Sequence, residues 1–288
     1  VEAYVDDVVV KTKHVETLVD DLRVTFDNLR AYDIKLNPEK CVFGVPDGKL
    51  LGFIVSGRGI EANPAKIRAL SQLDIPKDLK QIQELTGCVA ALSRFISRLG
   101  EKALPLYHLL RRTKYFEWTD AATAGLEEIK AILATNPVLA APNLGEPMLL
   151  YIAATHQVVS AVLVVEQETE GHRFALQKLV YYVSTVLTPC KSRYPHYQKI
   201  AYAVFMASRK PRHYFQECSI TVASEVPLND IINNRDVTGR IAKWAIELLP
   251  WRAIKSQVLA DFVTEWTEAE LPKEYGAYSN WIMHFDGT

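Results

Sequence analysis

"MLLYIAATHQVVSAVLVVEQE" (residues 148–168) contains two runs of β-branched and apolar residues, which predict a β-hairpin. A third strand-like run, "KLVYYVS" (178–184), a helical pattern, "YQKIAYAVFMASRK" (197–210), and a further strand, "SITVAS" (219–224), come after it. Strands followed by mixed helix and strand are typical of an α+β or α/β layer fold. We therefore expect such a domain in this half of the chain.

The region before this hairpin has a different pattern. "NPVLAAPNLGEP" (136–147) is rich in Pro and Gly and is expected to be a linker. From Asn63 to about Leu133 the apolar residues recur at helical spacing, and Asp78 with Gln81 forms a capping-box pattern. Residues 62–120 contain ten Lys or Arg against six Asp or Glu, which indicates a locally basic helical region.

The first residues predict smaller elements. "AYVDDVVVKT" (3–12) indicates strand, turn and strand, and an amphipathic helix is expected to run to about Ala31. "CVFGVPDGKLLGFIVSGRGI" (41–60) predicts two short strands around Pro46-Asp47-Gly48. The adjacent aspartates Asp6 and Asp7 fit either an ordinary hairpin turn or a divalent-metal site, because two ionised neighbours repel unless a cation lies beside them.

Bulk composition narrows the class of protein. The chain has 288 residues, 49% apolar and 23% charged, with a net charge of −1, so any nucleic-acid surface must be local. Four widely separated cysteines predict reduced thiols in an intracellular, reducing compartment. No apolar run is long enough to cross a membrane, and no targeting signal is visible. A start in the middle of a strand suggests a fragment.

The order of motifs resembles a known family. "YVDD", then "LNPEKCVFGV", "LLGFIVSGRGIEANPAKI", "IQELTGCVAALSRFISRLGEKALPLYHLLRR" and "FEWT" are similar to the reverse transcriptases of gypsy-type LTR retrotransposons. This resemblance implies a partial palm (1–61), a helical thumb (62–135), a linker (136–147) and a degenerate RNase H-like connection domain (148–259). A connector (260–279) and the first strand of a second RNase H (280–288) would follow.

By the same resemblance, Asp6 and Asp7 match the metal-binding pair of the palm, which uses Mg²⁺ for two-metal phosphoryl transfer. A third carboxylate and the fingers are missing from this sequence, so the site is incomplete and primer extension is not expected. Lys40 lies either near an incoming triphosphate or on a solvated surface. The residues implied to position the primer are Tyr4, Leu51, Gly52 and Phe53.

The basic helical region matches the thumb, which contacts the template–primer backbone. A surplus of four positive charges also fits ordinary solvated helix faces. The residues assigned to nucleic-acid binding are Lys66, Lys80, Arg94, Arg98 and Lys102.

The RNase H-like segment departs from the pattern of an active nuclease. Ala153, Ile200 and Ser224 stand where the family has two aspartates and a glutamate that hold metal ions. Glu225 is one residue away, but a one-residue shift on a strand points the side chain to the other face. His156 and His196 are expected to be surface or packing residues. The short path from "AKWAIELLP" to "WRAIKSQVLADF" predicts a deleted strand and an exposed sheet edge.

The last residues, "WIMHFDGT", resemble the first strand of a second RNase H, in which Asp286 would be a metal ligand. The alternative is a turn aspartate at a frayed terminus. Without strand partners, residues 270–288 are expected to be poorly ordered.

Three functions remain open at this point. The chain is an inactive, truncated reverse transcriptase, or a non-catalytic module that binds an RNA–DNA hybrid, a primer–template duplex or the remainder of Pol, or a stable remnant without a partner. Salt-dependent affinity for a hybrid separates the second function from the third.

Overall fold

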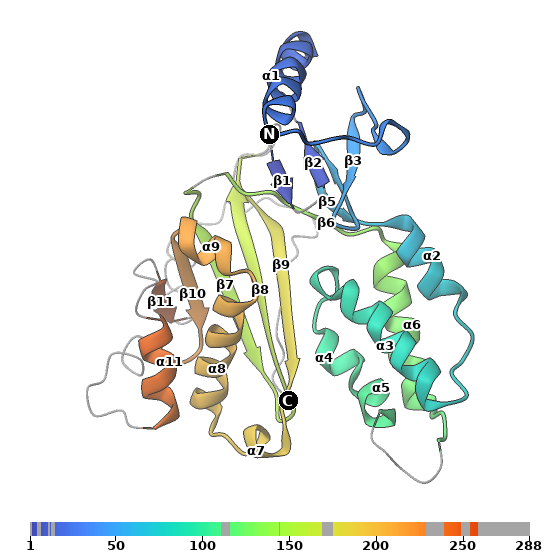
Figure 1. Cartoon of the computed structure of the whole chain (residues 1–288). Coiled ribbons are helices and arrows are strands. Elements are labelled where there is room, and N and C mark those ends of the chain that lie inside the picture. The colour runs from blue at the N-terminus through green and yellow to red at the C-terminus, as the bar shows by residue number, and fades with distance from the viewer. Residues whose placement is uncertain are drawn as a thin grey trace, which may run out of the picture. The chain divides into compact units, whose positions relative to one another are not determined.

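The computed structural model describes residues 2–4, 7–10, 12, 15–110, 116–143, 145–168, 175–228, 239–248 and 254–258, and the structural statements below concern these residues. The chain divides into two units, Val1–Asn63 and Pro64–Thr288, which are described separately (Figure 1). The predictions for residues 260–288, including Asp286, lie outside the described residues.

The first unit opens with the predicted hairpin. Strands β1 (Glu2–Tyr4) and β2 (Asp7–Val9) pair antiparallel, with Tyr4 opposite Asp7. Asp7 therefore belongs to the second strand, so the prediction of a turn formed by both aspartates is wrong. After the 3-10 turn η1 (Val15–Thr17), helix α1 (Leu18–Ala31) ends at the predicted residue.

A three-strand antiparallel meander completes this unit. It consists of β3 (Asp47–Leu50), β4 (Phe53–Ser56) and β5 (Gly59–Ala62), preceded by the 3-10 turn η2 (Pro38–Lys40). The predicted turn at Pro46-Asp47-Gly48 is wrong, because Asp47 and Gly48 begin β3. The tight turn is at Leu51 and Gly52, whose φ angles are 51° and 79°. Two positive φ angles match the right-handed twist of a hairpin better than the common turn types do.

The second unit begins with helices, as predicted. This helical region (residues 64–134) contains α2 (Pro64–Gln72), α3 (Leu79–Ala91), η3 (Ser93–Phe95), α4 (Leu99–Lys102), α5 (Leu104–Leu109) and α6 (Asp120–Ala134). The cap of α3 is confirmed: the Gln81 amide donates to Asp78 Oδ1 at 2.8 Å, and Gln81 Oε1 accepts from the Lys77 amide at 2.8 Å. Buried residues of these helices form the core, among them Ile82, Leu85, Phe95, Leu106, Ile129 and Leu133.

The expected linker is partly regular. It contains β6 (Val138–Leu139), and the Ala140 amide donates to the Leu179 carbonyl at 2.6 Å. This segment is therefore held against the sheet that follows.

A five-stranded sheet dominates the rest of the described chain. Its order is β11-β10-β7-β8-β9, formed by β7 (Met148–Ala154), β8 (Val158–Gln167), β9 (Leu176–Val186), β10 (Ile220–Ser224) and β11 (Ile254–Val258). The predicted hairpin is confirmed as antiparallel β7 and β8, while β10 is parallel to β7. The prediction of a deleted strand is wrong, because β11 pairs in parallel with β10 at this edge. We call residues 148–258 the sheet domain.

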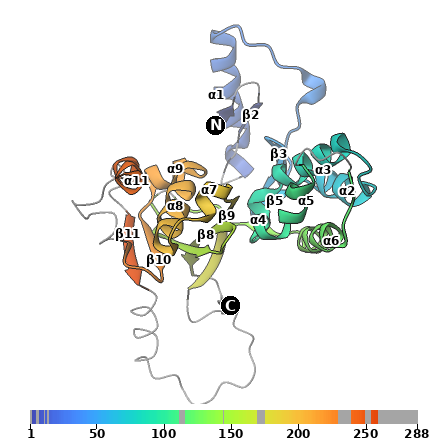
Figure 2. The ribbon, with the colours of Figure 1, turned by 90° about the horizontal axis from the view of Figure 1, so that it is seen from below.

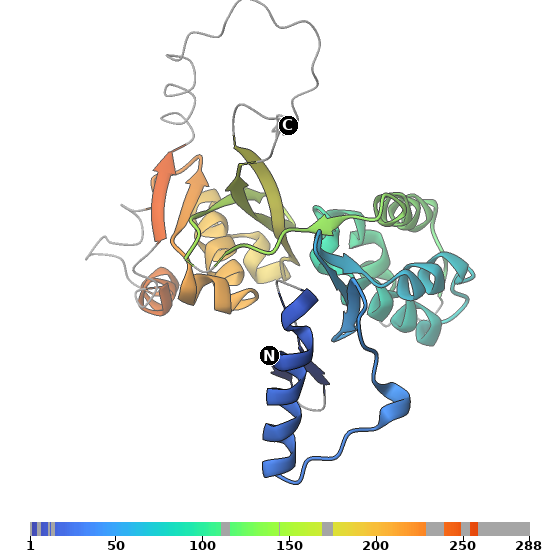
Figure 3. The same ribbon diagram turned by 90° about the horizontal axis from the view of Figure 1, so that it is seen from above.

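Helices cover one face of this sheet. Figures 2 and 3 show α8 (His196–Arg209), α9 (Arg212–Glu217) and α11 (Arg240–Leu248) on the same side of the strands. The short α7 (Pro189–Ser192) precedes α8. Tyr202 and Phe205 on α8 contact Trp244 on α11, with ring centroids 5.4 and 5.9 Å apart. These aromatic rings fix α11 to α8, which in turn packs on β7 and β8.

Candidate nucleic-acid interface and altered nuclease site

The two predicted palm aspartates are only partly described. Asp6 lies outside the described residues, and for Asp7 and Tyr4 the structure describes the backbone alone. The hairpin register places Tyr4 and Asp7 opposite each other, at the ends of β1 and β2. Lys40 is exposed at the end of η2.

The residues assigned to primer positioning form the turn between β3 and β4. Leu51 and Gly52 occupy the two turn positions, and Phe53 begins β4. Leu51 is 47% exposed although it is a large apolar residue. Its left-handed backbone costs about 1–2 kcal/mol relative to the usual conformation. An exposed, strained leucine is a feature for which stability alone gives no reason.

The three positions predicted to have lost nuclease acids lie on adjacent elements of the sheet domain. Ala153 is near the end of β7, and Ser224 ends the parallel neighbouring strand β10. Ile200 is fully buried on α8, in the core that this helix forms with the sheet. Ser224 is also buried, and its hydroxyl accepts from the Val226 amide and donates to the Val226 carbonyl, both at 3.1 Å. None of these three side chains can bind a metal ion as a carboxylate does.

Lys199, which sequence reasoning missed, lies beside these positions. Its side chain is 6% exposed, and its Nζ donates to the carbonyl oxygens of Thr155 at 3.2 Å and His156 at 3.1 Å. Both carbonyls belong to the turn that joins β7 to β8. A buried lysine needs such partners because burial of an unpaired charge is costly. The available signal was a lysine adjoining apolar positions of a helix that faces the core.

A second contact that the sequence did not predict links α8 to the end of β10. His196 Nε2 lies 2.7 Å from Glu225 Oε1, and both side chains are about half exposed. The expectation that His196 and His156 are surface residues is confirmed by their exposure. Lys199 and the His196–Glu225 pair together link α8, the β7–β8 turn and β10 without a metal ion.

This arrangement does not fit the two magnesium ions of an RNase H site. Such ions need several carboxylate oxygens around them. Within the described ranges, no group of three or more His, Cys, Asp or Glu side chains could hold a metal ion.

The predicted phosphate-binding residues have different environments. Lys80 on α3 is exposed, and Lys66 on α2 and Lys102 on α4 are half-buried. The Arg94 guanidinium lies over the Tyr181 ring, 5.1 Å from its centroid, and Arg98 forms an ion pair with Glu101. Arg94 is thus placed against β9 of the sheet domain, which the sequence did not predict.

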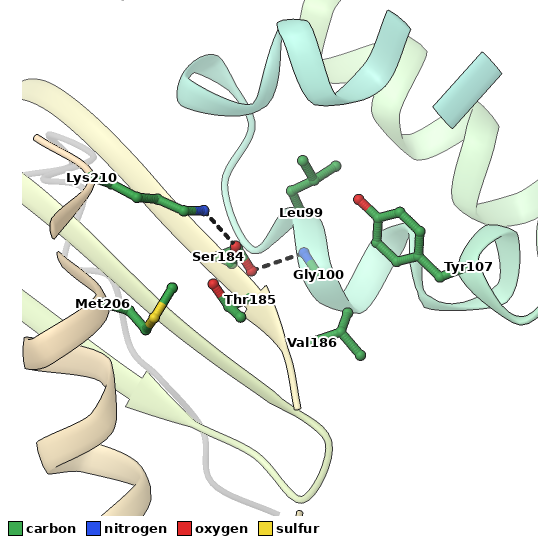
Figure 4. A pocket seen from close by; sticks show the side chains of 8 residues that line it. All are labelled: Leu99, Gly100, Tyr107, Ser184, Thr185, Val186, Met206 and Lys210. Carbon is green, nitrogen blue, oxygen red and sulfur yellow. Dashed lines mark hydrogen bonds between the residues drawn. The ribbon is translucent and has the colours of Figure 1, made fainter. Parts of the chain in front are cut away.

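The helical region and the sheet domain meet around Gly100 and Ser184. The Gly100 amide donates to Ser184 Oγ at 2.8 Å, and Ser184 Oγ lies 2.9 Å from Ser160 Oγ (Figure 4). Lys210 Nζ donates to the Ser184 carbonyl at 3.1 Å, and burial lowers the pKa of this amine. An open pocket of about 460 Å³ adjoins these residues. Its lining residues are Leu99, Gly100, Tyr107, Ser184, Thr185, Val186, Met206 and Lys210.

Comparisons with known proteins show what this chain is similar to. Residues 118–222 match the family described as the RNase H-like domain found in reverse transcriptase. The chain is 25% identical over 251 residues to the "Retrovirus-related Pol polyprotein from transposon 297" of Drosophila melanogaster. It is 26% identical over 277 residues to the Pol polyprotein from transposon opus of the same species. The chain is a relative of retrotransposon Pol polyproteins.

The matches to these Pol polyproteins cover most of the chain but only part of each relative. They span 85% of the chain and 22% of the transposon 297 polyprotein, and 90% of the chain and 27% of the opus polyprotein. The chain thus corresponds to about a quarter of these relatives. The family match begins before α6, earlier than the first strand of the sheet domain.

Solved structures agree with the expected fold. The foamy viral protease-reverse transcriptase in complex with RNA/DNA hybrid matches with a TM-score of 0.71 at 18% identity, over 96% of this chain and 37% of that chain. The same viral protein, as a form named dRH in complex with double-stranded DNA, gives 0.69 at 19% identity, over 86% and 44%. The predicted mixed α and β fold of the reverse transcriptase type is confirmed. No helix in the described part of the chain is long and apolar enough to cross a membrane.

Proposed function

We propose that this chain is the palm, thumb and connection part of a gypsy-type reverse transcriptase, in which the helical region binds a duplex and the RNase H-like domain does not cleave it. The observation that carries this proposal is the altered nuclease site. Ala153, Ile200 and Ser224 replace the acids, and the buried Lys199 ammonium lies beside them. The substrate class is a template–primer duplex, either an RNA–DNA hybrid or double-stranded DNA.

The polymerase role rests on the palm pair. Asp6 and Asp7 would hold Mg²⁺, which would activate the primer hydroxyl and stabilise the leaving pyrophosphate. Leu51, Gly52 and Phe53 would hold the primer end through their tight turn. A third carboxylate is not found at a matching position in the 288 residues, so this chain alone is not expected to extend a primer. The remainder of Pol is the partner that would complete the site.

The duplex-binding role rests on the helical region. Its exposed and half-buried lysines can contact phosphates without reading sequence, and such contacts release counterions on binding. Lys80 and Lys102 are the most suitable for a test, because Arg94 and Arg98 already have partners within the chain. The predicted binding residues are spread over this region: Lys66 on α2, Lys80 on α3, Arg94 on η3, Arg98 at the N-cap of α4 and Lys102 on α4.

Affinity for a labelled RNA–DNA hybrid, measured over a range of salt concentrations, tests this role. Each lost phosphate contact should lower the slope of log affinity against log salt by about 0.9. The Lys80→Glu/Lys102→Glu variant should therefore bind more weakly and with a flatter salt dependence. Lys178→Glu/Lys243→Glu on the sheet domain changes the net charge equally and is the matched control.

Two results separate this proposal from the alternatives. Equal loss of affinity in both double variants would mean that net charge, and not the helical region, determines binding. Absence of salt-dependent binding would favour a stable remnant without a nucleic-acid partner. Primer extension after the missing part of the palm is supplied, abolished by Asp6→Asn, would support the polymerase role.

A further inference from the structure

Gly100 makes an unusually close contact between the helical region and the sheet domain. It lies in the first turn of α4, where backbone amides have no acceptor within the helix. Its amide instead donates to Ser184 Oγ, a residue 84 positions later in the chain. Gly100 is buried, so this hydrogen bond satisfies a donor that water does not reach.

The contact continues into the sheet. Ser184 on β9 is directly opposite Ser160 on β8, and their hydroxyl oxygens are 2.9 Å apart. Lys210, which caps α8, donates to the Ser184 carbonyl from the helical side of the sheet domain. Ser184 is thus bonded through its hydroxyl and its carbonyl to three elements: α4, β8 and the end of α8.

Glycine is required at position 100 by the lack of space. A Cβ atom there would lie 2.7 Å from Val158 Cγ1 and 2.8 Å from Ser184 Oγ. Both distances are shorter than real Cβ contacts, so a larger residue requires the Val158 and Ser184 side chains to move or α4 to shift away from β8 and β9. Figure 4 shows Gly100 and Ser184 facing each other across this contact. Arg94 over Tyr181 supplies a second contact between η3 and β9.

We propose that Gly100, Ser184 and Ser160 form a rigid joint that fixes the helical region on the sheet domain. We call these three residues the Gly100 joint. This inference rests on the proposed function, for which it supplies the role of the non-cleaving domain. The joint holds the phosphate-binding lysines of the helical region at a constant position relative to the sheet domain. Gly100 and Ser184 are then positioning residues that do not themselves touch the duplex.

The native cysteines allow a direct test without nucleic acid. Cys88 on α3 and Cys190 on α7 are exposed, Cys218 is buried, and Cys41 can be removed as Cys41→Ser. Spin labels on Cys88 and Cys190 report the separation of the two parts by pulsed electron paramagnetic resonance. The Cys41→Ser protein should give one narrow distance distribution.

Two joint variants should broaden this distribution while the helix content stays unchanged. Ser184→Ala removes the acceptor without adding volume, and Gly100→Ala adds the clashing methyl group. Gly87→Ala on α3 is the matched control, because a Cβ there meets nothing within 4 Å; it should leave the distribution narrow. If Gly100→Ala does not fold, the distance distribution of Ser184→Ala alone tests the joint.

A narrow, unshifted distribution in Ser184→Ala would overturn the joint, whatever the protein binds. Failure of hybrid binding in the parent chain would instead count against the proposed function and would leave this distance measurement intact. Broadening in Ser184→Ala together with a narrow distribution in Gly87→Ala supports the joint.

Discussion

Lys199 lies between Gln198 and Ile200 on α8, and its ammonium group is buried under the turn that joins β7 to β8. In a nuclease of this fold the same region would attract cations. Here the Lys199 ammonium group donates to two carbonyl oxygens of that turn, those of Thr155 and His156.

Lys199→Met should therefore destabilise the protein. Methionine keeps the apolar stem but leaves the Thr155 and His156 carbonyls without their donor, which costs about 1–3 kcal/mol. Urea unfolding followed by circular dichroism measures the change. Lys243→Met on the exposed side of α11 is the control and should change the unfolding free energy by less than about 0.5 kcal/mol. Equal effects in both variants would contradict a structural role for Lys199.

Placing acids at the positions of Ile200 and Ala153 should destabilise the fold more than it promotes nuclease activity. Ile200 is fully buried, so Ile200→Glu places a carboxyl group in the core and should cost about 3 kcal/mol or more. Ala153 is half-buried at the end of β7, and Ala153→Asp should cost less. Urea unfolding of the two single variants checks this order. A stable Ile200→Glu protein would mean that the site has kept the shape of an active nuclease.

At the scale of elements, the packing of α6 on α4 depends on one glycine. A Cβ atom at Gly125 would lie 2.2 Å from the Lys102 carbonyl oxygen, which is backbone and cannot rotate away. Gly125→Ala should destabilise the helical region by about 1–3 kcal/mol or more, because the two helices must separate. Gly87→Ala, with open space around it in the middle of α3, should stabilise by about 0.5–1 kcal/mol. Thermal unfolding tests whether Gly125→Ala lowers the melting temperature and Gly87→Ala raises it.

His213 on helix α9 should make the stability of the folded protein depend on pH. Burial lowers the pKa of His213, nearby Arg94 lowers it further, and Glu217 opposes them. The folded state thus favours neutral His213, so this stabilisation is complete above the unfolded pKa of about 6.5 and is lost as the pH falls below it. His213→Asn should remove that part of the pH dependence. The urea midpoints of the parent protein and of His213→Asn are measured at about pH 7.5 and pH 5.5. An equal change of the midpoint between these pH values in both proteins would contradict a role for His213.

Local patterns predicted most elements of this chain, and long-range contacts account for what they missed. The β7–β8 hairpin, α8 and the Asp78 cap follow from alternation, helical spacing and turn chemistry within a few residues. Local signals placed a turn at Pro46-Asp47-Gly48, which the structure contradicts, because Pro, Asp and Gly are strong turn residues. The turn at Leu51 and Gly52 was implied only by the family resemblance, since leucine rarely adopts a positive φ. Lys199 and Gly100 gain their roles from partners 43 to 84 residues away, which no local pattern reveals.

At the scale of the whole molecule, the chain has a reverse-transcriptase-type fold, and in our proposal its sheet domain lacks the acids that bind metal ions in a nuclease. In our proposal, the helical region supplies the charges for a duplex, and the sheet domain supports that region through the Gly100 joint. Binding and cleavage are therefore expected to be separate properties in this chain, although the fold is that of a nuclease domain.

The most direct test incubates the chain with an end-labelled RNA–DNA hybrid and Mg²⁺, and measures binding and RNA cleavage in the same sample. We expect a complex that weakens as the salt concentration rises, and an RNA strand that stays intact. Glu225→Gln, which removes the carboxylate next to Ser224, should leave that result unchanged. Magnesium-dependent cleavage of the RNA strand that is abolished by Glu225→Gln would contradict the central claim.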